Sequence, residues 1–261
     1  MGRRGLALIL VLVAAPLQAR ELRVCADPNN LPFSNDRREG FENKLIEMAA
    51  ADLAASVNYV WRAQRRGNVR ETLNAGLCDV IPGIGASLEM LATTIPYYRS
   101  SYMFVTRADR QLSLACFDDE RLRELKIGVQ LVGDDGANTP PAHALSRRGI
   151  VGNVRGFLIY GDYRSTTPQS PIIDAVVRGE VDVAIAWGPV AGWFAARSPV
   201  PLRLTPTPPL DGPRLPMTFE VSMGVHKEDQ SLRRELNGWI AKNESRIAAL
   251  LQSQSIPVIT Q

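Results

Sequence analysis

The chain has 261 residues, of which 45% are hydrophobic and 22% charged, the composition of a globular protein with enough apolar material for a core. Its formal net charge is +3 and falls to +1 when Arg3 and Arg4 are removed with the expected signal peptide. A net charge this small excludes the basic field that nucleic-acid binding requires. The two histidines, His143 and His226, lie in no cluster with metal-ligand spacing, so we expect neither a metal site nor a bound cofactor.

Residues 1–19 have the pattern of a secretory signal peptide. The basic pair Arg3-Arg4 precedes an apolar run of about ten residues, and the small Ala19 stands at the expected cleavage point. The run is shorter than the roughly 20 residues that span a bilayer, and no later segment is apolar enough to do so. A buried N-terminal helix is the alternative, but it would leave both arginines poorly placed. We therefore expect a periplasmic protein that begins near Arg20 and is not integral to the membrane.

The first expected elements alternate between strands and helices. Residues 22–25 have the pattern of a short strand, and apolar residues recur at helical spacing from Phe41 to Leu53. Residues 75–81 indicate a helix end, a glycine stop and a buried strand. The order strand, helix, strand, helix, strand up to Gly85 predicts a parallel sheet with right-handed crossovers.

A second copy of this unit follows at a constant offset. The strand-like residues 125–128 lie 103 positions after residues 22–25, and Asp182 lies 103 positions after Asp79. Both aspartates stand three residues after a glycine that ends a helical pattern, and a buried strand follows each of them. Two matches at one offset predict two copies of a single α/β lobe.

The remaining elements follow from the same patterns. Thr139 is the expected N-cap of a helix that begins with Pro140. The later elements are, in chain order, a helix over 172–177 that stops at Gly179, a buried strand over 181–187, an irregular Pro-rich segment over 199–216, a strand over 218–225 and helices over 231–241 and 243–254.

We therefore expect an α/β protein of two lobes, each a mainly parallel sheet flanked by helices. The first lobe comprises residues 20–106 and 218–261, because the C-terminal helices return to it, and the second comprises residues 107–217. The chain crosses between the lobes near residues 104–107 and 206–218, which together form a hinge. A cleft between two lobes is a preferred place for ligands.

Several short motifs resemble those of periplasmic solute-binding proteins of the polar-amino-acid type, family 3. The motifs keep the family's order across nearly the whole mature chain, and the resemblance implies the type II periplasmic binding fold with a two-stranded hinge. They are Leu22-Arg23-Val24-Cys25-Ala26-Asp27, Pro32-Phe33, Gly40-Phe41-Glu42, Cys78-Asp79-Val80 and Pro96-Tyr97-Tyr98.

Longer stretches are similar to a narrower group, the binding-like accessory proteins (MoxJ/XoxJ type) of PQQ-dependent alcohol dehydrogenase systems. This resemblance implies a periplasmic role in methanol oxidation beside a quinoprotein dehydrogenase and its cytochrome c, with no settled ligand. The stretches are Val24 to Asn35, Gly40-Phe41-Glu42-Asn43-Lys44, Gln64-Arg65-Arg66-Gly67, Tyr97-Tyr98-Arg99-Ser100, Gly133 to Leu145 and Trp187-Gly188-Pro189-Val190-Ala191-Gly192-Trp193-Phe194.

The chain departs from amino-acid receptors at their ligand clamps. By alignment, Met90 stands where that family has the arginine that binds the ligand carboxylate. Trp187 stands where the family has the aspartate that binds the ligand ammonium, and Arg66 and Asn30 replace an aromatic shelf. Because both specificity elements are missing, we do not expect an amino-acid receptor.

Eight residues are candidates for the walls of the ligand cleft. Ligands of open α/β sheets bind at the carboxyl ends of strands, and helix N-termini attract anions. The candidates are Asp27, Asn29, Asn30, Arg65, Arg66, Gly85, Thr139 and Trp187.

Each candidate also has a purely structural interpretation. Asp27 can cap its own loop, as Asn29 and Asn30 often do in turns. Arg65 and Arg66 can form a solvated pair, and Trp187 can serve packing alone. Near Thr139, the preceding Asp134 and Asp135 can occupy the helix N-terminus themselves. The sequence leaves these alternatives open and indicates no catalytic residue.

Three cysteines in an exported chain allow one disulfide and one free thiol. Cys25 and Cys78 are the better pair, because Cys116 lies in a polar connecting stretch. In the expected register, however, they are staggered by three residues at about 3.3 Å each, which exceeds the usual Cα separation of about 4.4–6.8 Å. Pairing therefore requires a bulge or another register, and three unpaired cysteines are the alternative.

Three functions fit this sequence. The first is a binding or accessory protein of a PQQ-dependent dehydrogenase system. The second is a receptor that delivers a small polar solute to an ABC transporter. The third is an enzyme on the same scaffold, for which no Ser/His/Asp or Cys/His arrangement provides a mechanism. We expect the first.

Overall fold

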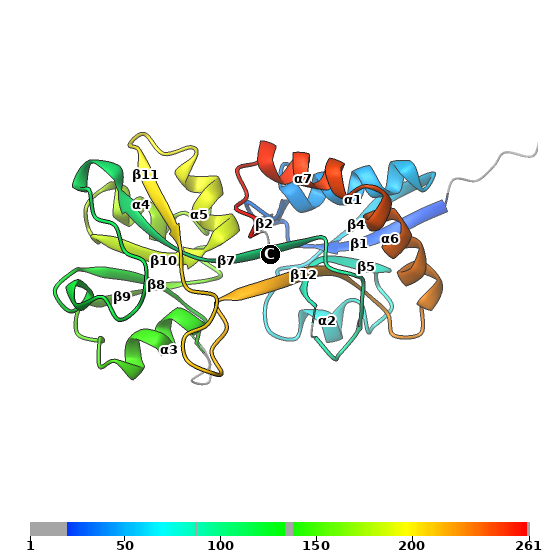
Figure 1. The fold of residues 1–261 in the computed structure, drawn as a ribbon. Coiled ribbons are helices and arrows are strands. Elements are labelled where there is room, and N and C mark those ends of the chain that lie inside the picture. The colour runs from blue at the N-terminus through cyan, green and yellow to red at the C-terminus, as the bar shows by residue number, and fades with distance from the viewer. Residues whose placement is uncertain (1–19, 87, 134–137, 260–261) are drawn as a thin grey trace, which may run out of the picture.

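The computed structural model of the chain describes residues 20–86, 88–133 and 138–259, so the expected signal peptide lies outside the described residues. Its elements form two lobes, at the right and left of Figure 1, joined by β7 (Tyr98–Arg107) and by the residues before β12 (Thr218–Val225). The other elements of the first lobe are β1 (Arg20–Ala26), β2 (Asn29–Asn30), β3 (Ser34–Asn35), α1 (Phe41–Asp52), β4 (Ala55–Trp61), α2 (Asn68–Glu71), β5 (Val80–Gly85), β6 (Ala92–Thr93), α6 (Gln230–Lys242) and α7 (Glu244–Ser253). Those of the second lobe are η1 (Ala108–Arg110), η2 (Glu120–Arg123), β8 (Ile127–Leu131), α3 (Pro140–Arg147), β9 (Val154–Leu158), α4 (Pro171–Val177), β10 (Val183–Trp187), α5 (Gly188–Ala195) and β11 (Leu202–Pro206).

The first lobe contains the parallel sheet that its sequence predicts. The strands lie in the order β4-β1-β5-β12, in which the first three are parallel and β12 is antiparallel to β5. Val24 pairs with Tyr59 on one side and with Val80 on the other. Because β1, β4 and β5 run the same way, their carboxyl ends meet at one edge, which faces the second lobe (Figure 1).

The second lobe repeats the arrangement with β10, β8 and β9 as its parallel strands. Here one expectation is wrong. The Pro-rich segment 199–216 is not wholly irregular, because β11 lies within it and pairs antiparallel with β7. Leu202 and Leu204 alternate with polar residues and are half-buried against the core, and this period of two outweighs the flanking prolines.

The hinge consists of two neighbouring strands. Residues 98–101 of β7 pair with β12 in the first lobe, whereas residues 102–107 pair with β10 and β11 in the second. A single strand therefore belongs to both sheets and changes partners between Ser101 and Tyr102. We propose this point as the lobe boundary, so that residues 102–217 form the second lobe.

The internal repeat has a matching set of hydrogen bonds. The Asp79 carboxylate accepts from the Arg23 backbone N–H at 2.8 Å, and the Asp79 N–H donates to the Arg23 carbonyl at 2.8 Å. Asp182 exchanges the same two bonds with Lys126, at 2.9 Å and 2.8 Å. Arg23 and Lys126 are themselves 103 positions apart, so the offset in the sequence reflects one structural unit that occurs twice.

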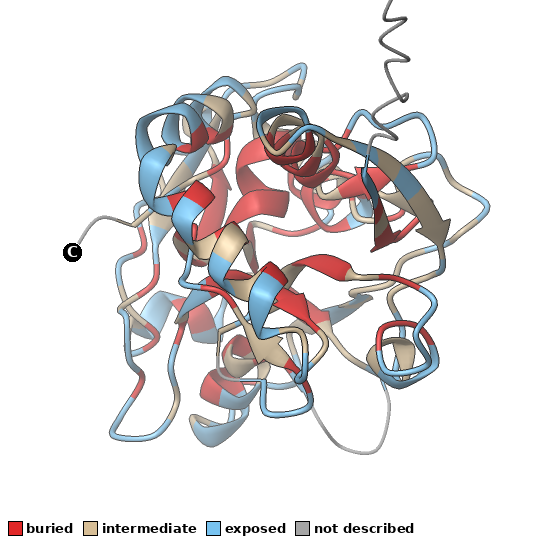
Figure 2. Ribbon diagram, turned by 90° about the vertical axis from the view of Figure 1, so that its right-hand side faces the viewer, coloured by how far each residue is buried: buried red, intermediate tan, exposed pale blue. Residues whose placement is uncertain are grey.

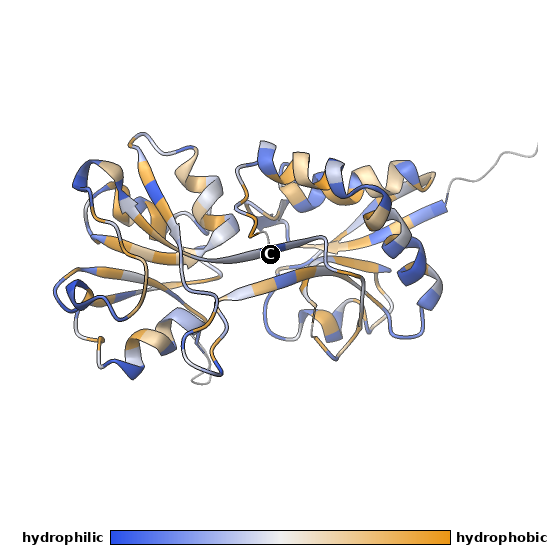
Figure 3. Cartoon of the chain, viewed as in Figure 1, coloured by the Kyte–Doolittle hydropathy of each residue, from blue (hydrophilic) through white to orange (hydrophobic). Residues whose placement is uncertain are grey.

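The C-terminal helices pack on the first lobe. The Trp239 indole N–H donates a 2.8 Å hydrogen bond to the carboxylate of Asp52, the last residue of α1. Figure 2 shows buried residues on strands and inner helix faces and exposed ones on outer turns, and Figure 3 shows hydrophobic residues following the same strands. Beyond α7 the chain turns toward the hinge, where the Ser100 hydroxyl donates to the Pro257 carbonyl at 2.7 Å.

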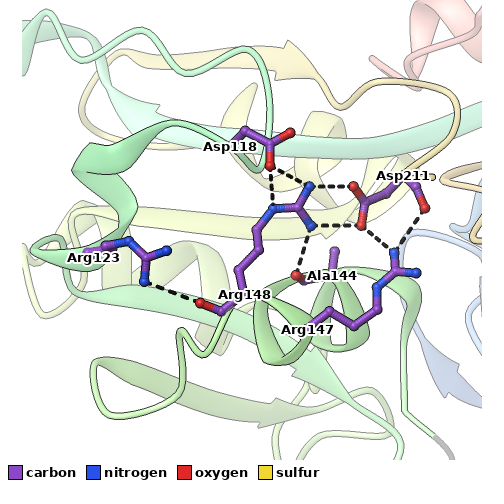
Figure 4. A network of polar contacts seen from close by, with 6 residues as sticks. All are labelled: Asp118, Arg123, Ala144, Arg147, Arg148 and Asp211. Atoms are coloured by element: carbon purple, nitrogen blue, oxygen red, sulfur yellow. Dashed lines mark hydrogen bonds and ion pairs between the residues drawn. The ribbon is translucent and has the colours of Figure 1, made fainter.

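An ionic network holds the loop between β11 and β12 against α3 (Figure 4). Asp211, whose side chain is 9% exposed, accepts hydrogen bonds from Arg148 at 2.7 Å and from Arg147 at 2.5 Å. These bonds, those of Arg148 first, lower the pKa of the Asp211 carboxyl. Arg148 also binds Asp118 at 2.8 Å. The network fixes the helix whose N-terminus reaches the cleft.

Cys25 and Cys78 form a disulfide with Cα atoms 5.6 Å apart, within the usual range. The expected stagger does not prevent pairing, because Cys78 precedes the first residue of β5, Val80, and so does not follow the rise of that strand. The chain before it is turned, with the Leu77 N–H donating to the Thr72 carbonyl at 3.0 Å. Cys116 is a free, half-buried thiol.

Candidate functional site

A cavity of about 600 Å³ lies between the lobes, at the carboxyl ends of their parallel strands. Four of the eight residues expected at the cleft line it, namely Asn30 and Gly85 from the first lobe and Thr139 and Trp187 from the second. The other four lie beside it, at contacts between the lobes or in an adjoining pocket.

Asp27 follows β1 and is only 3% exposed, and its carboxylate binds other protein groups. One oxygen accepts from the Asn29 N–H at 2.8 Å and from the Tyr163 hydroxyl, and the other accepts from the Gln64 N–H at 2.7 Å. The bond to Asn29 is the loop cap expected as an alternative. The bond to Tyr163 reaches the second lobe, and burial, followed by this bond, raises the pKa of that phenol.

Asn29 and Asn30 also contact the second lobe. The Asn29 side-chain amide donates to the carbonyls of Tyr163, at 3.1 Å, and Ser165, at 2.8 Å. The Asn30 side-chain carbonyl accepts from the Gln169 amide at 3.0 Å. All these partners belong to one loop, residues 159–170, which follows β9 and covers the ends of β1 and β2.

Arg65 completes the contact between the lobes. Its guanidinium lies 5.3 Å from the ring centre of Tyr160 and 5.1 Å from that of Tyr163, within the range of cation–π attraction. Arg66, its neighbour, lines a pocket of about 250 Å³ that shares Gln64 and Tyr160 with the larger cavity. We call the contacts of Asp27, Asn29, Asn30 and Arg65 with residues 159–170 the interlobe interface.

On the second lobe, Gln130 organises the cavity wall. Its side-chain carbonyl accepts from the Trp187 N–H at 2.8 Å, and its backbone carbonyl accepts from the Thr139 hydroxyl at 2.5 Å. Thr139 is the N-cap residue of α3 by position, but its hydroxyl is bonded to Gln130 and makes no capping bond to the helix. Asp134 and Asp135, the expected competitors for this helix end, lie outside the described residues.

Trp187 both packs and lines the cavity. Its ring lies 5.4 Å from that of Tyr102 and 5.9 Å from that of Phe219, centre to centre, and these two are 6.4 Å apart. All three pairs meet edge to face, the favourable arrangement of aromatic rings. Since Tyr102 and Phe219 lie on the two hinge strands, this three-ring cluster forms the cavity wall next to the hinge.

Glu42 is a cavity residue that the sequence analysis did not select. It is the second residue of α1 and is 2% exposed, and the described residues donate no hydrogen bond to its carboxyl group. Burial, with a smaller contribution from the charge of Asp27, raises its pKa from 4.5 to about 8. The Glu42 carboxyl lies against Gly83, where an added Cβ would meet its oxygen at 2.0 Å. The motif Gly40-Phe41-Glu42 draws attention to this residue, but the sequence does not show that the Glu42 side chain is buried beside the cavity.

The two positions at which amino-acid receptors bind the ligand carboxylate and ammonium, Met90 and Trp187 here, do not share the cavity. Met90 is 48% exposed and does not line the cavity, whereas Trp187 does. No arginine, lysine or histidine belongs to the described lining of this cavity. In the described ranges no three His, Cys, Asp or Glu side chains are grouped as metal ligands, and no helix has the length and apolarity to cross a bilayer.

Comparison with known proteins gives consistent matches over nearly the whole chain. The family model described as bacterial extracellular solute-binding proteins, family 3, matches residues 22–252. Protein MoxJ of Methylorubrum extorquens (strain AM1) is 31% identical over 258 residues, which cover 94% of this chain and 84% of MoxJ.

Two solved structures share the fold and its two lobes. The periplasmic binding protein XoxJ from Methylobacterium extorquens AM1 aligns with a TM-score of 0.75 at 36% identity, covering 92% of this chain and 100% of XoxJ. MxaJ from Methlophaga aminisulfidivorans MPT aligns with a TM-score of 0.77 at 26% identity, covering 91% of this chain and 100% of MxaJ. The two-lobed type II periplasmic binding fold expected from the sequence is confirmed.

Proposed function

Because the chain belongs to family 3 of the bacterial extracellular solute-binding proteins, we propose that it is a periplasmic accessory protein of a PQQ-dependent methanol or alcohol dehydrogenase system. Its partners in this proposal are the dehydrogenase and its cytochrome c, and it acts by binding, without catalysis. The likeness to MoxJ and XoxJ along the chain supports this function over that of a transport receptor.

The interlobe interface is the structural observation that carries the proposal. A transport receptor closes around its solute, so residues at the strand ends are needed for the ligand. In this chain Asp27 and Asn29 bind Tyr163 and Ser165 of the opposite lobe instead. The lobes are therefore held together by their own side chains, which suits a protein that acts on a protein partner.

The charge of the cavity also argues against an amino-acid cargo. A ligand carboxylate requires a cationic partner when it is removed from water. Glu42 and Glu220 are the charged residues of the described lining, and both are acidic. An amino acid in this cavity would leave its carboxylate beside them without a counter-charge.

Co-purification tests the proposed partnership. A C-terminally tagged chain, expressed from its own gene and isolated from the periplasmic fraction, should recover a PQQ-dependent alcohol dehydrogenase. The matched control is a tagged family 3 receptor exported in the same strain. Failure to recover the dehydrogenase above that control, with or without mild crosslinking, would contradict the proposal.

A receptor for a small polar solute is the alternative, and thermal unfolding separates the two. A ligand at a hundredfold over its dissociation constant stabilises the folded state by about 2.7 kcal/mol, which is readily seen as a higher Tm. We expect no shift with any of the twenty amino acids. A clear shift with one of them would favour the receptor.

The periplasmic location has its own test. N-terminal sequencing of the chain from the periplasmic fraction should begin near Arg20. Recovery of a chain that still carries residues 1–19 would show that no signal peptide is removed.

A further inference from the structure

The Glu42 carboxyl group belongs to the cavity wall, its residue is 2% exposed, and it accepts no hydrogen bond from the described residues. It belongs to the first turn of α1 and is held in place by the Gly83 backbone on one side. A buried carboxyl without a hydrogen bond costs free energy, and folded proteins normally pair such groups. Because the side chain borders the cavity, its partner there is water or a ligand that displaces the water.

The surrounding walls define which ligand fits. The other acidic lining residue, Glu220, is exposed, so an anion would meet repulsion from Glu220 and, where Glu42 is ionised, from both carboxylates. The three-ring cluster of Tyr102, Trp187 and Phe219 lines the same cavity. Aromatic faces attract cations and cover apolar groups, and a buried carboxylate binds ammonium N–H donors.

We propose that the cavity binds a small organic cation, a primary or secondary ammonium compound without a carboxylate, whose N–H groups donate to Glu42 and whose alkyl or aryl part lies against the three-ring cluster. This inference names the ligand class of the cleft in the proposed accessory protein. It rests on the proposed function only because it treats the cleft as a binding site. A neutral ligand carries no positive charge to pair with Glu42 once that carboxyl is ionised.

Protonation of Glu42 gives the inference a second, independent signature. Its pKa of about 8 keeps the carboxyl mostly protonated near neutral pH, so a bound ammonium must displace that proton. The groups that face it are Asp27, Tyr97 and Tyr98, and the pKa values of both buried tyrosines lie well above 10, so neither ionises in this range. Simple ammonium compounds stay charged up to a pH of about 10, as lysine does. Affinity should therefore rise with pH up to about 8 and then level off.

Titration calorimetry with matched compounds tests the ligand class. The probes are methylammonium, dimethylammonium, butylammonium and benzylammonium, with butan-1-ol, benzyl alcohol, butanoate and benzoate as skeleton-matched controls. We expect at least one ammonium compound to bind about tenfold more tightly than its alcohol, and the carboxylates not to bind. Equal binding of the alcohols, any preference for the carboxylates, or no binding of any ammonium probe at millimolar concentration would overturn the inference.

A pair of variants on one helix tests the role of Glu42. Glu42→Gln should weaken ammonium binding at least tenfold, whereas Glu47→Gln, the same side-chain substitution outside the cavity, should leave it unchanged. Circular dichroism establishes that both fold. Titration of the native chain at pH 7 in buffers of different ionisation enthalpy should show the release of about one proton per ammonium bound. Unaltered ammonium binding by Glu42→Gln would contradict the assignment. Ammonium binding to the native chain without proton release would also contradict it, and that measurement does not depend on whether Glu42→Gln folds. Loss of ammonium binding would not affect co-purification with the dehydrogenase, so the two proposals fail separately.

Discussion

The Asn29 side-chain amide donates a 2.8 Å hydrogen bond to the carbonyl of Ser165, and these two residues belong to opposite lobes. With the Tyr163 hydroxyl bound to Asp27, the bond holds the lobes in contact without a ligand between these groups. Lobe closure in this chain is therefore a property of its own side chains.

The double variant Asn29→Ala with Tyr163→Phe should open the lobes. Each lost hydrogen bond is worth about 1 kcal/mol, and the variant removes the three side-chain bonds that Asn29 and Tyr163 make across the lobes. Small-angle X-ray scattering should give a larger radius of gyration than that of the native chain. Asn58→Ala, which removes an exposed amide bonded to Glu21 within the first lobe, is the control. An unchanged radius for the double variant would mean that other contacts close the cleft.

Stability should fall as the pH rises from about 4.5 to about 8. The folded-state pKa of Glu42, about 8, lies above its ordinary value of 4.5, so its contribution is complete below pH 4.5 and is lost as the pH rises through 8. One unit of pKa corresponds to about 1.4 kcal/mol. Urea unfolding at several pH values should show a smaller decline for Glu42→Gln than for the native chain. Glu47→Gln should keep the native slope, and an equally steep decline in Glu42→Gln would contradict this origin.

Removing the disulfide should lower the free energy of unfolding. Cys25 and Cys78 are 53 residues apart, and cross-links over such loops typically contribute about 2–4 kcal/mol. The double variant Cys25→Ser with Cys78→Ser should lose stability of this size in urea unfolding, with no further loss in a reducing buffer. Cys116→Ser, at the free thiol, should stay within about 0.5 kcal/mol of the native value. A reducing buffer that leaves the native chain equally stable would argue against the disulfide.

Two glycines on helices should respond oppositely to alanine. A Cβ at Gly192 of α5 would lie 2.1 Å from the Ser255 carbonyl oxygen and 2.5 Å from Pro257, so Gly192→Ala should displace the C-terminal residues from the second lobe. Nothing lies within 4 Å of a Cβ at Gly238 of α6, and Gly238→Ala should stabilise the chain by about 0.5–1 kcal/mol. Hydrogen exchange of the Ile259 N–H, which is bonded to Arg99, should quicken only in Gly192→Ala. Protection of that N–H in both variants would contradict the steric argument.

Local and repeated features of the fold could be predicted from the sequence. The common offset of Asp79 and Asp182 indicates the repeat, and the two make the same pair of bonds, Asp79 to Arg23 in β1 and Asp182 to Lys126 just before β8. The helix that begins at Pro140 and the strand over 218–225 also have the expected starts. These elements depend on residues near one another in the chain, so periodicity and capping patterns suffice to place them.

Features that depend on contacts between distant segments could not be predicted. Whether Cys25 and Cys78 can pair depends on the residue at which β5 begins. The strand β11 lies among prolines and is identified by its pairing with β7. At the site, Asp27 follows the first strand as expected, but the partners of Asp27 and Asn29 in the other lobe lie more than 130 positions away. Glu42 belongs to the motif Gly40-Phe41-Glu42, but only the packed fold shows it buried against Gly83.

The central claim is that this chain supports a PQQ-dependent alcohol dehydrogenase, and one measurement tests it most directly. PQQ-dependent alcohol oxidation is assayed in periplasmic extracts of the parent strain, of a strain lacking the gene, and of that strain carrying the gene in trans. The account predicts that activity falls in the deletion strain and that the native gene restores it. Equal dehydrogenase activity in all three extracts would contradict the account.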